Sequence, residues 1–184
     1  NNKLEIDKES LLSYLSFRYV IGEKTFYKNI VDVLPGNCVV YNKNGMTNAV
    51  FWDVPTCHTE AVSLDDCINR LDFYIDQSVS SQLMSDVPLG AFISGGLDSS
   101  LLLSYIVKYK PDVKTYISGF EQEKYNEFMY ADIVANHLNI SVDKILMNEN
   151  NYIDSIDEAI RYRGEPLSVP HENVFLNMTQ YLSK

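Results

Sequence analysis

A glycine- and serine-rich loop, residues 94–100, holds the residue types best suited to chemistry on an anion. It reads Ser-Gly-Gly-Leu-Asp-Ser-Ser and follows the short apolar segment 91–93. The adjacent Gly95 and Gly96 allow the backbone to approach an oxyanion closely and to turn its N–H groups towards it. Ser99 and Ser100 add hydroxyls at the start of an expected helix, where the helix dipole favours anions. The loop therefore predicts a phosphate-binding site.

Asp98 is the one member of this loop that a simple phosphate site does not explain. Its carboxylate would repel a phosphate group unless a Mg²⁺ ion lay between them, so we expect Asp98 to be a metal ligand. The loop matches neither the Gly-x-x-x-x-Gly-Lys-Ser/Thr pattern nor the Gly-x-Gly-x-x-Gly pattern of common nucleotide sites. The alternative interpretation is an ordinary glycine-rich turn between a strand and a helix.

The segments around the loop alternate between strand and helix, which predicts an α/β fold with a doubly wound parallel sheet covered on both faces. Such a sheet binds ligands outside the carboxyl ends of its strands, which is where the loop stands. The expected strands are 91–93, 116–119 and 140–147, and the expected helices are 64–83, 100–109, 126–138, 152–163 and 171–184. Apolar residues at steps of three and four predict that one face of the helix at 64–83 packs inward.

Residues 1–55 have a different texture, with one short helix at 9–17 followed by strand-like segments. The segments 38–41 and 49–52 flank Asn44-Gly45, a strong hairpin signal because both residues tolerate positive φ. So few residues would make only a thin core. We therefore expect residues 1–55 to be the β-rich end of a larger domain, and residues 56–184 to begin a second one.

The composition indicates an ordinary folded chain: 184 residues, 46% of them hydrophobic and 22% charged. A net charge of −10 gives no general attraction to nucleic acid or to an anionic membrane surface. No apolar run approaches the roughly 20 residues that a membrane helix needs. Nucleic acids and membranes are thus not expected as partners.

The cysteines Cys38, Cys57 and Cys67 are odd in number and form no Cys-x-x-Cys pair. This usage favours a reducing, cytoplasmic compartment in which the thiols are small buried apolar groups. Cys57-His58 does not predict a structural metal site, because no second ligand pair follows it.

The loop resembles the pyrophosphate loop of the ATP pyrophosphatases, and its surroundings resemble the glutamine-dependent asparagine synthetases. The loop with its upstream flank, residues 86–100, carries the most specific part of this resemblance. The other matching segments are 14–20, 34–37, 51–55, 125–127, 130–131 and 165–167. The resemblance covers nearly the whole chain, and related synthetases that share the loop lack the upstream domain.

The resemblance implies ATP and Mg²⁺ as ligands, and it assigns roles to nine residues. Pyrophosphate would be held by Ser94, Gly95, Gly96, Asp98 and Ser99, with Asp98 also the Mg²⁺ ligand; Phe92 and Ile93 would lie beside the nucleotide, and Ser118 and Gly119 would frame adenosine. The implied enzyme is a carbon–nitrogen ligase that adenylates a carboxylic acid such as aspartate and releases pyrophosphate. Ammonia from glutamine then displaces AMP.

The resemblance also implies that this sequence is a fragment, inactive by itself. Residues 1–55 match the C-terminal part of a class II glutaminase domain, and residues 56–184 match the N-terminal part of an ATP-pyrophosphatase domain. The N-terminal cysteine nucleophile of the family is not in this sequence, and neither is its second Ser-Gly-x-Gly-x-Asp-Glu-type motif. We therefore assign no catalytic residue. Homodimer formation is left open.

Several side chains allow two interpretations. Asn126 and Glu127 are candidates for the nucleotide edge, and the alternative for Asn126 is to cap the start of the helix. Arg161 and Arg163 either reach phosphate or complement a helix dipole. Residues 171–173 fall where the family lines its acceptor site, but His-Glu-Asn departs from what an enzyme committed to aspartate would have.

The acceptor therefore stays open between aspartate and another carboxylic acid, such as a sugar acid. A different class of function is a non-catalytic nucleotide-binding homologue. The intact Asp98 argues against that class, because a degenerate loop would be free to lose a carboxylate beside phosphate.

Overall fold

A computed structural model describes residues 4–56 and 61–182, so the predictions on Cys57 and His58 lie outside the described residues. The chain forms two compact units, one of Asn1–Thr59 with Asp157–Glu172 and the other of Glu60–Ile156 with Asn173–Lys184. Every helix among the described residues is too short or too polar to cross a lipid bilayer.

The first unit is built on helix α1 (Lys8–Phe17), the second half of α5 (Glu149–Arg163) and the segment that follows it. Asp7 caps α1 by accepting hydrogen bonds from the backbone N–H of Ser10 at 3.3 Å and from its hydroxyl at 2.8 Å. Tyr14 of α1 packs edge-on against Phe26, and its hydroxyl donates to the Leu167 carbonyl at 2.7 Å. This bond joins residues far apart in the sequence and stabilises the unit.

The same unit contains an antiparallel hairpin of β1 (Asn37–Asn42) and β2 (Gly45–Val50), which confirms the hairpin prediction. Asn42 pairs with Gly45, so the connecting residues are Lys43 and Asn44, one position earlier than expected. Gly45 alone of the predicted turn pair has a positive φ, 112°. The assignment of this β-rich unit to a glutaminase domain stays a prediction.

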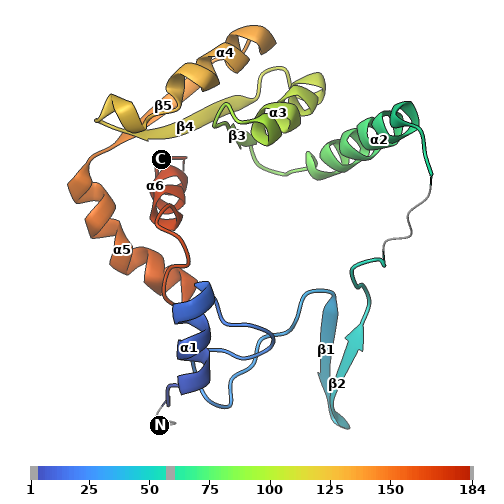
Figure 1. Ribbon diagram of the computed structural model, residues 1–184, viewed down its shortest axis with the longest axis vertical. Helices are drawn as coiled ribbons and strands as arrows, with labels where there is room; N and C mark the ends of the chain where they lie inside the picture. The colour runs from blue at the N-terminus through green and yellow to red at the C-terminus, as the bar shows by residue number, and fades with distance from the viewer. Residues whose placement is uncertain (1–3, 57–60, 183–184) are drawn as a thin grey trace. The chain divides into compact units, whose positions relative to one another are not determined.

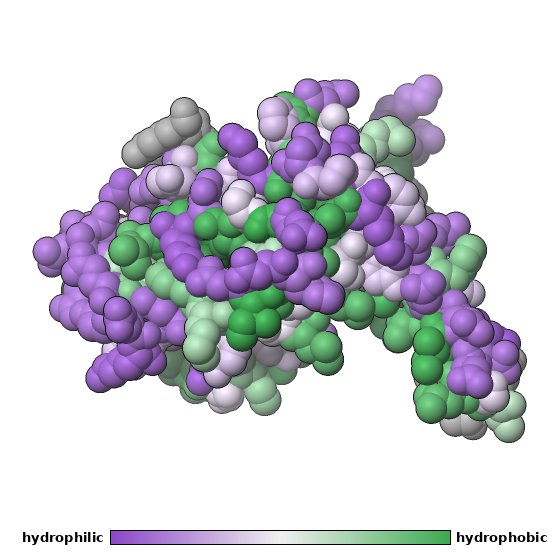
Figure 2. Space-filling model, turned by 90° about the horizontal axis from the view of Figure 1, so that it is seen from above, coloured by the Kyte–Doolittle hydropathy of each residue, from purple (hydrophilic) through white to green (hydrophobic). Residues whose placement is uncertain are grey.

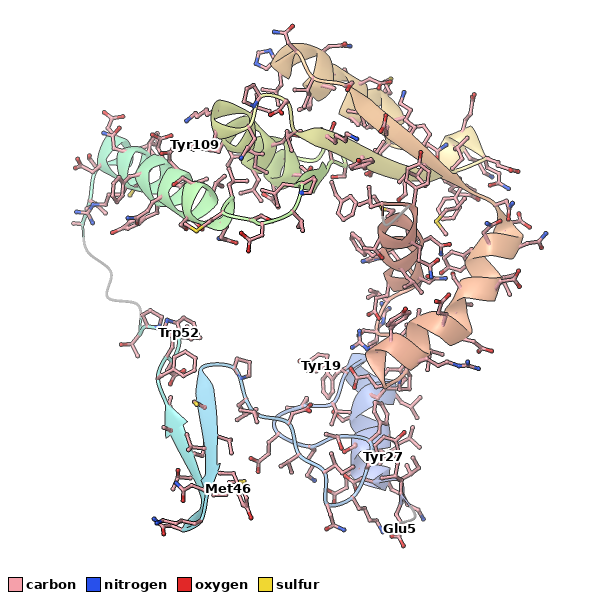
Figure 3. The ribbon with its side chains drawn as sticks, turned by 180° about the vertical axis from the view of Figure 1, so that it is seen from behind. Glu5, Tyr19, Tyr27, Met46, Trp52 and Tyr109 are labelled. Atoms are coloured by element: carbon pink, nitrogen blue, oxygen red, sulfur yellow. The ribbon has the colours of Figure 1, made fainter. Side chains whose placement is uncertain are left out.

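The base of the hairpin is closed by Gly36, whose carbonyl accepts from the N–H groups of Phe51 and Trp52 at 2.8 and 3.2 Å. Gly36 has a φ of +72°, and a Cβ there would lie 2.0 Å from the Trp52 carbonyl oxygen. Trp52 is labelled at this end of the hairpin in Figure 3. Only glycine therefore fits at position 36.

The second unit contains a parallel sheet of β3 (Gly90–Phe92), β4 (Lys114–Phe120) and β5 (Val142–Met147), in that spatial order. Helices α3 (Leu97–Tyr109) and α4 (Phe128–Leu138) make the crossovers, and a short 3₁₀ turn, η1 (Glu123–Tyr125), precedes α4. The predicted α/β class with parallel strands is confirmed. These strands follow chain order, so the reversal that defines a doubly wound sheet stays a prediction.

Helices pack against both faces of this sheet. α3 and α4 lie over one face and α6 (Glu172–Leu182) over the other, which Figure 1 shows for α4 and α6. The first core cluster is Ile93, Leu103, Val113, Ile117 and Ala131; the second is Tyr116, Ile145 and Met178. The neighbours Tyr116 and Ile117 therefore point to opposite faces, as alternation along a strand requires.

Helix α2 (Leu64–Gln82) packs on α3 through two phenol–carboxylate hydrogen bonds. Tyr109 donates to Asp76 at 2.6 Å, and Tyr105 donates to Asp72 one turn earlier in both helices. Figure 3 labels Tyr109 near the end of α3. These bonds hold the second half of α2.

The prediction that one face of α2 packs inward is wrong for the first half of the helix. Val79 is buried, but Leu64 and Leu71 are 75% and 58% exposed. The prediction of buried thiols is also wrong, because Cys38 and Cys67 are both exposed. Cys38 lies on a two-stranded ribbon whose residues are nearly all exposed, and Cys67 lies in the exposed first half of α2. Figure 2 shows apolar residues gathered in patches on the surface.

Candidate functional site

The loop between β3 and α3 leaves a helix N-terminus open at the carboxyl edge of the sheet. α3 begins at Leu97, three residues earlier than expected, and Gly96 is its N-cap without a side-chain cap hydrogen bond. The first bond within the helix runs from Ser100 N–H to the Gly96 carbonyl at 3.1 Å. The N–H groups of the first turn have no partner within their helix, so this end attracts anions.

The serines of the loop hold its shape by bonding one another. The hydroxyls of Ser94 and Ser99 lie 3.0 Å apart, and Ser94 Oγ accepts from the Gly96 N–H at 3.3 Å. Ser100 Oγ donates to the Gly96 carbonyl at 2.6 Å. The loop is thus folded on itself, with hydroxyls and backbone donors gathered within one turn.

Gly95 presses the loop against the backbone of α4. Its φ is +76°, and a Cβ there would lie 2.4 Å from Tyr130 Cβ and 2.7 Å from the Ala131 nitrogen. Gly96 is different, since its φ is −72° and its nearest neighbour would be Ser94 Oγ at 3.2 Å. Gly95 is therefore required for packing against α4, whereas a Cβ at Gly96 would meet only the Ser94 side chain.

Asp98 lies in the exposed first turn of α3. Within residues 4–56 and 61–182, no group of three or more His, Cys, Asp or Glu side chains could hold a metal. A cation at Asp98 would take its other ligands from phosphate oxygens and water. That donor set fits Mg²⁺, which commonly binds one or two carboxylates together with substrate phosphates. A structural role for Asp98 is its favourable interaction with the helix dipole.

Phe92 and Ile93 precede the loop but point to opposite faces of the sheet. Ile93 is 3% exposed in the core beneath α3 and α4, so only its backbone can meet a nucleotide. Phe92 is 39% exposed and contacts the ring of Phe175 in α6, with centroids 6.1 Å apart. Of the two side chains, only that of Phe92 remains accessible.

Ser118 and Gly119 lie at the end of β4, on the same edge of the sheet as the loop. Phe92 pairs with Tyr116, so Ser118 lies two residues beyond the last residue of β3. Gly119 is buried, and a Cβ on it would lie 2.4 Å from Phe128 Cζ. The topology therefore brings the two predicted segments, 92–99 and 118–119, to one edge.

Asn126 is the contact that sequence reasoning missed. Its side-chain oxygen accepts from the Phe120 N–H at 2.7 Å, and its side-chain nitrogen donates to the Phe120 carbonyl at 2.6 Å. The helix-capping interpretation is wrong, because the N-cap of α4 is Glu127. No spacing rule connects a strand end to an amide beyond a loop, so the sequence carries no signal for this pair.

Arg163, at the end of α5 (Glu149–Arg163), binds two carboxylates. Its guanidinium contacts Glu165 and Glu172 at 2.7 Å each, and Glu172 also accepts from the N–H groups of Ser168 and Val169 at 3.1 and 3.3 Å. These contacts lie within the first unit and close the turn after α5. They leave the phosphate-binding interpretation of Arg163 without support.

The pKa values of this pair move apart. Burial alone would lower the pKa of Arg163, but its hydrogen bonds to Glu172 and Glu165 outweigh burial and raise it. Burial alone would raise the pKa of Glu172, but Arg163 and Ser168 outweigh burial and lower it. The pair therefore stabilises the folded state at neutral pH.

Glu172→Gln is expected to lower the free energy of unfolding by about 1–2 kcal/mol at neutral pH. Because the folded pKa of Glu172 lies below its ordinary 4.5, its contribution is complete above pH 4.5 and is lost as the pH falls through the folded pKa. Denaturant titrations between neutral pH and acid would measure this. The exposed Glu158→Gln is the matched control, and a difference that does not change with pH would contradict the prediction.

The segment 171–173 uses its polar groups on the protein. Glu172 is paired with Arg163, and Asn173, 0% exposed, donates through Nδ2 to the Tyr152 carbonyl at 2.9 Å. Among the described residues, Asn173 Oδ1 is a buried side-chain atom without a hydrogen-bond partner. Glu172 and Asn173 thus serve local structure, and a role in binding an acceptor stays a prediction.

The sequence profile of the asparagine synthase family matches residues 70–184, more than half of the chain. The chain belongs to the asparagine synthase family. It is 29% identical to the glutamine-hydrolyzing asparagine synthetase 1 of Bacillus subtilis (strain 168) over 169 residues, 92% of this chain and 27% of that protein. It is 24% identical to a putative asparagine synthetase of Mycobacterium tuberculosis (strain ATCC 25618 / H37Rv), over 90% of this chain and 26% of that protein.

The mouse asparagine synthetase is 29% identical over 53% of this chain and 18% of its own length. The chain thus spans about a quarter of the length of its bacterial relatives. The part matched to the asparagine synthase family contains the whole loop, the end of β4 and Asn126. The candidate site therefore lies inside the family region.

Proposed function

We propose that this chain carries the nucleotide-binding part of an ATP-dependent amidotransferase of the asparagine synthetase type. The observation that carries the proposal is the open N-terminus of α3, with an exposed aspartate in its first turn, at the carboxyl edge of a parallel sheet. Backbone N–H donors and a carboxylate in one helical turn suit a phosphate group bound together with a cation. The names of the relatives support the reaction class.

In this proposal the loop binds the pyrophosphate part of ATP. The hydroxyls of Ser94 and Ser99 and the N–H groups around Gly95 and Gly96 donate to its oxygens, and Asp98 holds Mg²⁺. The ion, when bound, neutralises charge on the leaving pyrophosphate. Phe92 and the backbone of Ile93, Ser118 and Gly119 lie beside the nucleoside.

The proposed reaction has two steps. A carboxylate oxygen of the acceptor attacks the α-phosphorus of ATP, the bond to the bridging oxygen breaks, and pyrophosphate leaves. Ammonia derived from glutamine then attacks the carbonyl carbon of the acyl-adenylate, and AMP leaves with the original carboxylate oxygen. The described residues contribute by positioning the nucleotide and by stabilising charge.

The exposed free thiols Cys38 and Cys67 support a reducing compartment such as the cytoplasm.

Aspartate is the proposed acceptor. A full-length protein incubated with Mg-ATP and ammonia, with and without aspartate, tests the acceptor. We expect AMP, pyrophosphate and asparagine to appear only with aspartate. Release of AMP and pyrophosphate with another carboxylic acid but not with aspartate would replace aspartate as the acceptor and retain the ATP chemistry.

Asp98→Ala is expected to weaken the binding of Mg-pyrophosphate by about tenfold to a hundredfold, because it removes the protein ligand of the cation. Calorimetric titration of the full-length protein would measure this. Asp86→Ala is the matched control, since Asp86 is also exposed but precedes β3, away from the loop. Equal affinity of the wild type and the Asp98 variant would refute the role of Asp98.

A further inference from the structure

Strand β4 extends beyond the end of its neighbour β3. The N–H of Ile93 donates to the Tyr116 carbonyl at 3.0 Å, just beyond the end of β3 at Phe92. Alternate residues of a strand turn their backbone groups to the same side, so Ser118 and Phe120 also face this side. There they lie beyond β3, next to the chain that enters the loop.

Asn126 binds the last of these backbone pairs. It accepts from the Phe120 N–H at 2.7 Å and donates to the Phe120 carbonyl at 2.6 Å. One neutral amide thus replaces the missing strand and closes the connection 121–125 on the end of β4. The N–H and carbonyl groups of Ser118, two residues before Phe120, lie between the end of β3 and the Asn126 side chain.

Gly119 allows the amide to lie close to the strand. A Cβ at this position would be 2.5 Å from Asn126 Oδ1 and 2.4 Å from Phe128 Cζ. Gly119 is buried beneath these groups, and Asn126 is half-buried. The amide, the phenyl ring and the strand end therefore pack directly against one another.

We propose that Asn126 is a positioning residue that fixes the backbone of Ser118 and Gly119 for the adenosine part of a bound nucleotide. The proposal rests on the proposed function, because it takes the strand end as the nucleoside side of that site. Asn126 acts through the backbone it holds and need not contact the nucleotide. The pyrophosphate loop 94–99 is held by its own serines and by the packing of Gly95 on Tyr130 and Ala131, so none of these contacts is made by Asn126 itself.

The test compares the binding of AMP and of Mg-pyrophosphate to the full-length protein by calorimetry. Asn126→Ala is expected to weaken AMP binding by about tenfold or more and to leave Mg-pyrophosphate binding within about twofold. Asn126→Asp retains the acceptor for the Phe120 N–H but loses the donor, so its AMP affinity should lie between those of the wild type and Asn126→Ala. Asn136→Ala removes an exposed amide from α4 and is the matched control.

Two further measurements distinguish a positioning role of Asn126 from a purely structural one. Hydrogen exchange at residues 119–125 should become faster in Asn126→Ala, and the KM for ATP should rise with little change in kcat. Equal losses of AMP and pyrophosphate binding would overturn the proposal, as would faster exchange with unchanged AMP affinity. A wild-type protein that binds neither ligand would instead overturn the proposed function, and this inference with it.

Discussion

Gly95→Ala is expected to lower the free energy of unfolding by about 2–5 kcal/mol and to abolish Mg-pyrophosphate binding. The residue has a φ of +76°, which by itself costs a non-glycine residue about 1–2 kcal/mol. The added methyl group would also lie within 2.4–2.7 Å of Tyr130 and Ala131, mostly against their backbone. α4 would have to move away, and the loop would lose its shape.

Gly22→Ala is the matched control for this effect. Gly22 has nearly the same φ, +77°, but a Cβ there would meet nothing within 4 Å. Its substitution should therefore show only the backbone contribution of about 1–2 kcal/mol. Denaturant unfolding and calorimetry on both variants measure the two effects, and equal losses of stability would show that the contact with α4 is not tight.

The second large effect is expected at Asn173, where Asn173→Asp should lower the free energy of unfolding by about 3–5 kcal/mol at neutral pH. Asn173 is 0% exposed, and its Nδ2 donates to the Tyr152 carbonyl. A carboxylate there could not donate, and it would be a buried charge facing a carbonyl oxygen. Its pKa would rise in the folded state, so part of the lost stability should return as the pH falls and the group binds a proton.

Asn173→Leu separates the charge from the shape of the side chain. The Tyr152 carbonyl also accepts from the Ser155 hydroxyl at 2.8 Å, so it keeps a partner when the amide is removed. Leucine also removes the buried Oδ1 that has no partner in the described part of the chain. We expect a loss of less than about 1.5 kcal/mol for Asn173→Leu. A loss as large as that of Asn173→Asp would mean that Oδ1 has a bound donor.

The order of strands and helices around the loop could be predicted because it depends on local signals. Apolar runs predicted three strands and the helices between them, and the parallel sheet then placed residues 94–100 at its carboxyl edge. The start of α3 could not be predicted, because Leu97-Asp98-Ser99 has no side-chain cap before it and a glycine N-cap is a weak signal. The observed start places Asp98 in the first turn of the helix and not in the loop.

Contacts between distant segments could not be predicted in the same way. The apolar stripe of α2 has the periodicity of a packed helix, yet periodicity does not say what covers the stripe, and Leu64 and Leu71 are exposed. An arginine at the end of a helix suits either interaction with the helix dipole or phosphate binding. Arg163 instead binds Glu172, across a turn that no local sequence rule predicts. Asn126 depends in the same way on where Phe120 lies.

The paired tyrosines of α3 restrict how α2 can slide. Tyr105 and Tyr109 are one turn apart, as are their acceptors Asp72 and Asp76. A shift of α2 by one turn, about 5.4 Å along its axis, would retain one phenol–carboxylate bond, whereas a shift of half a turn would retain none. The two bonds therefore favour registers that differ by a whole turn over those in between.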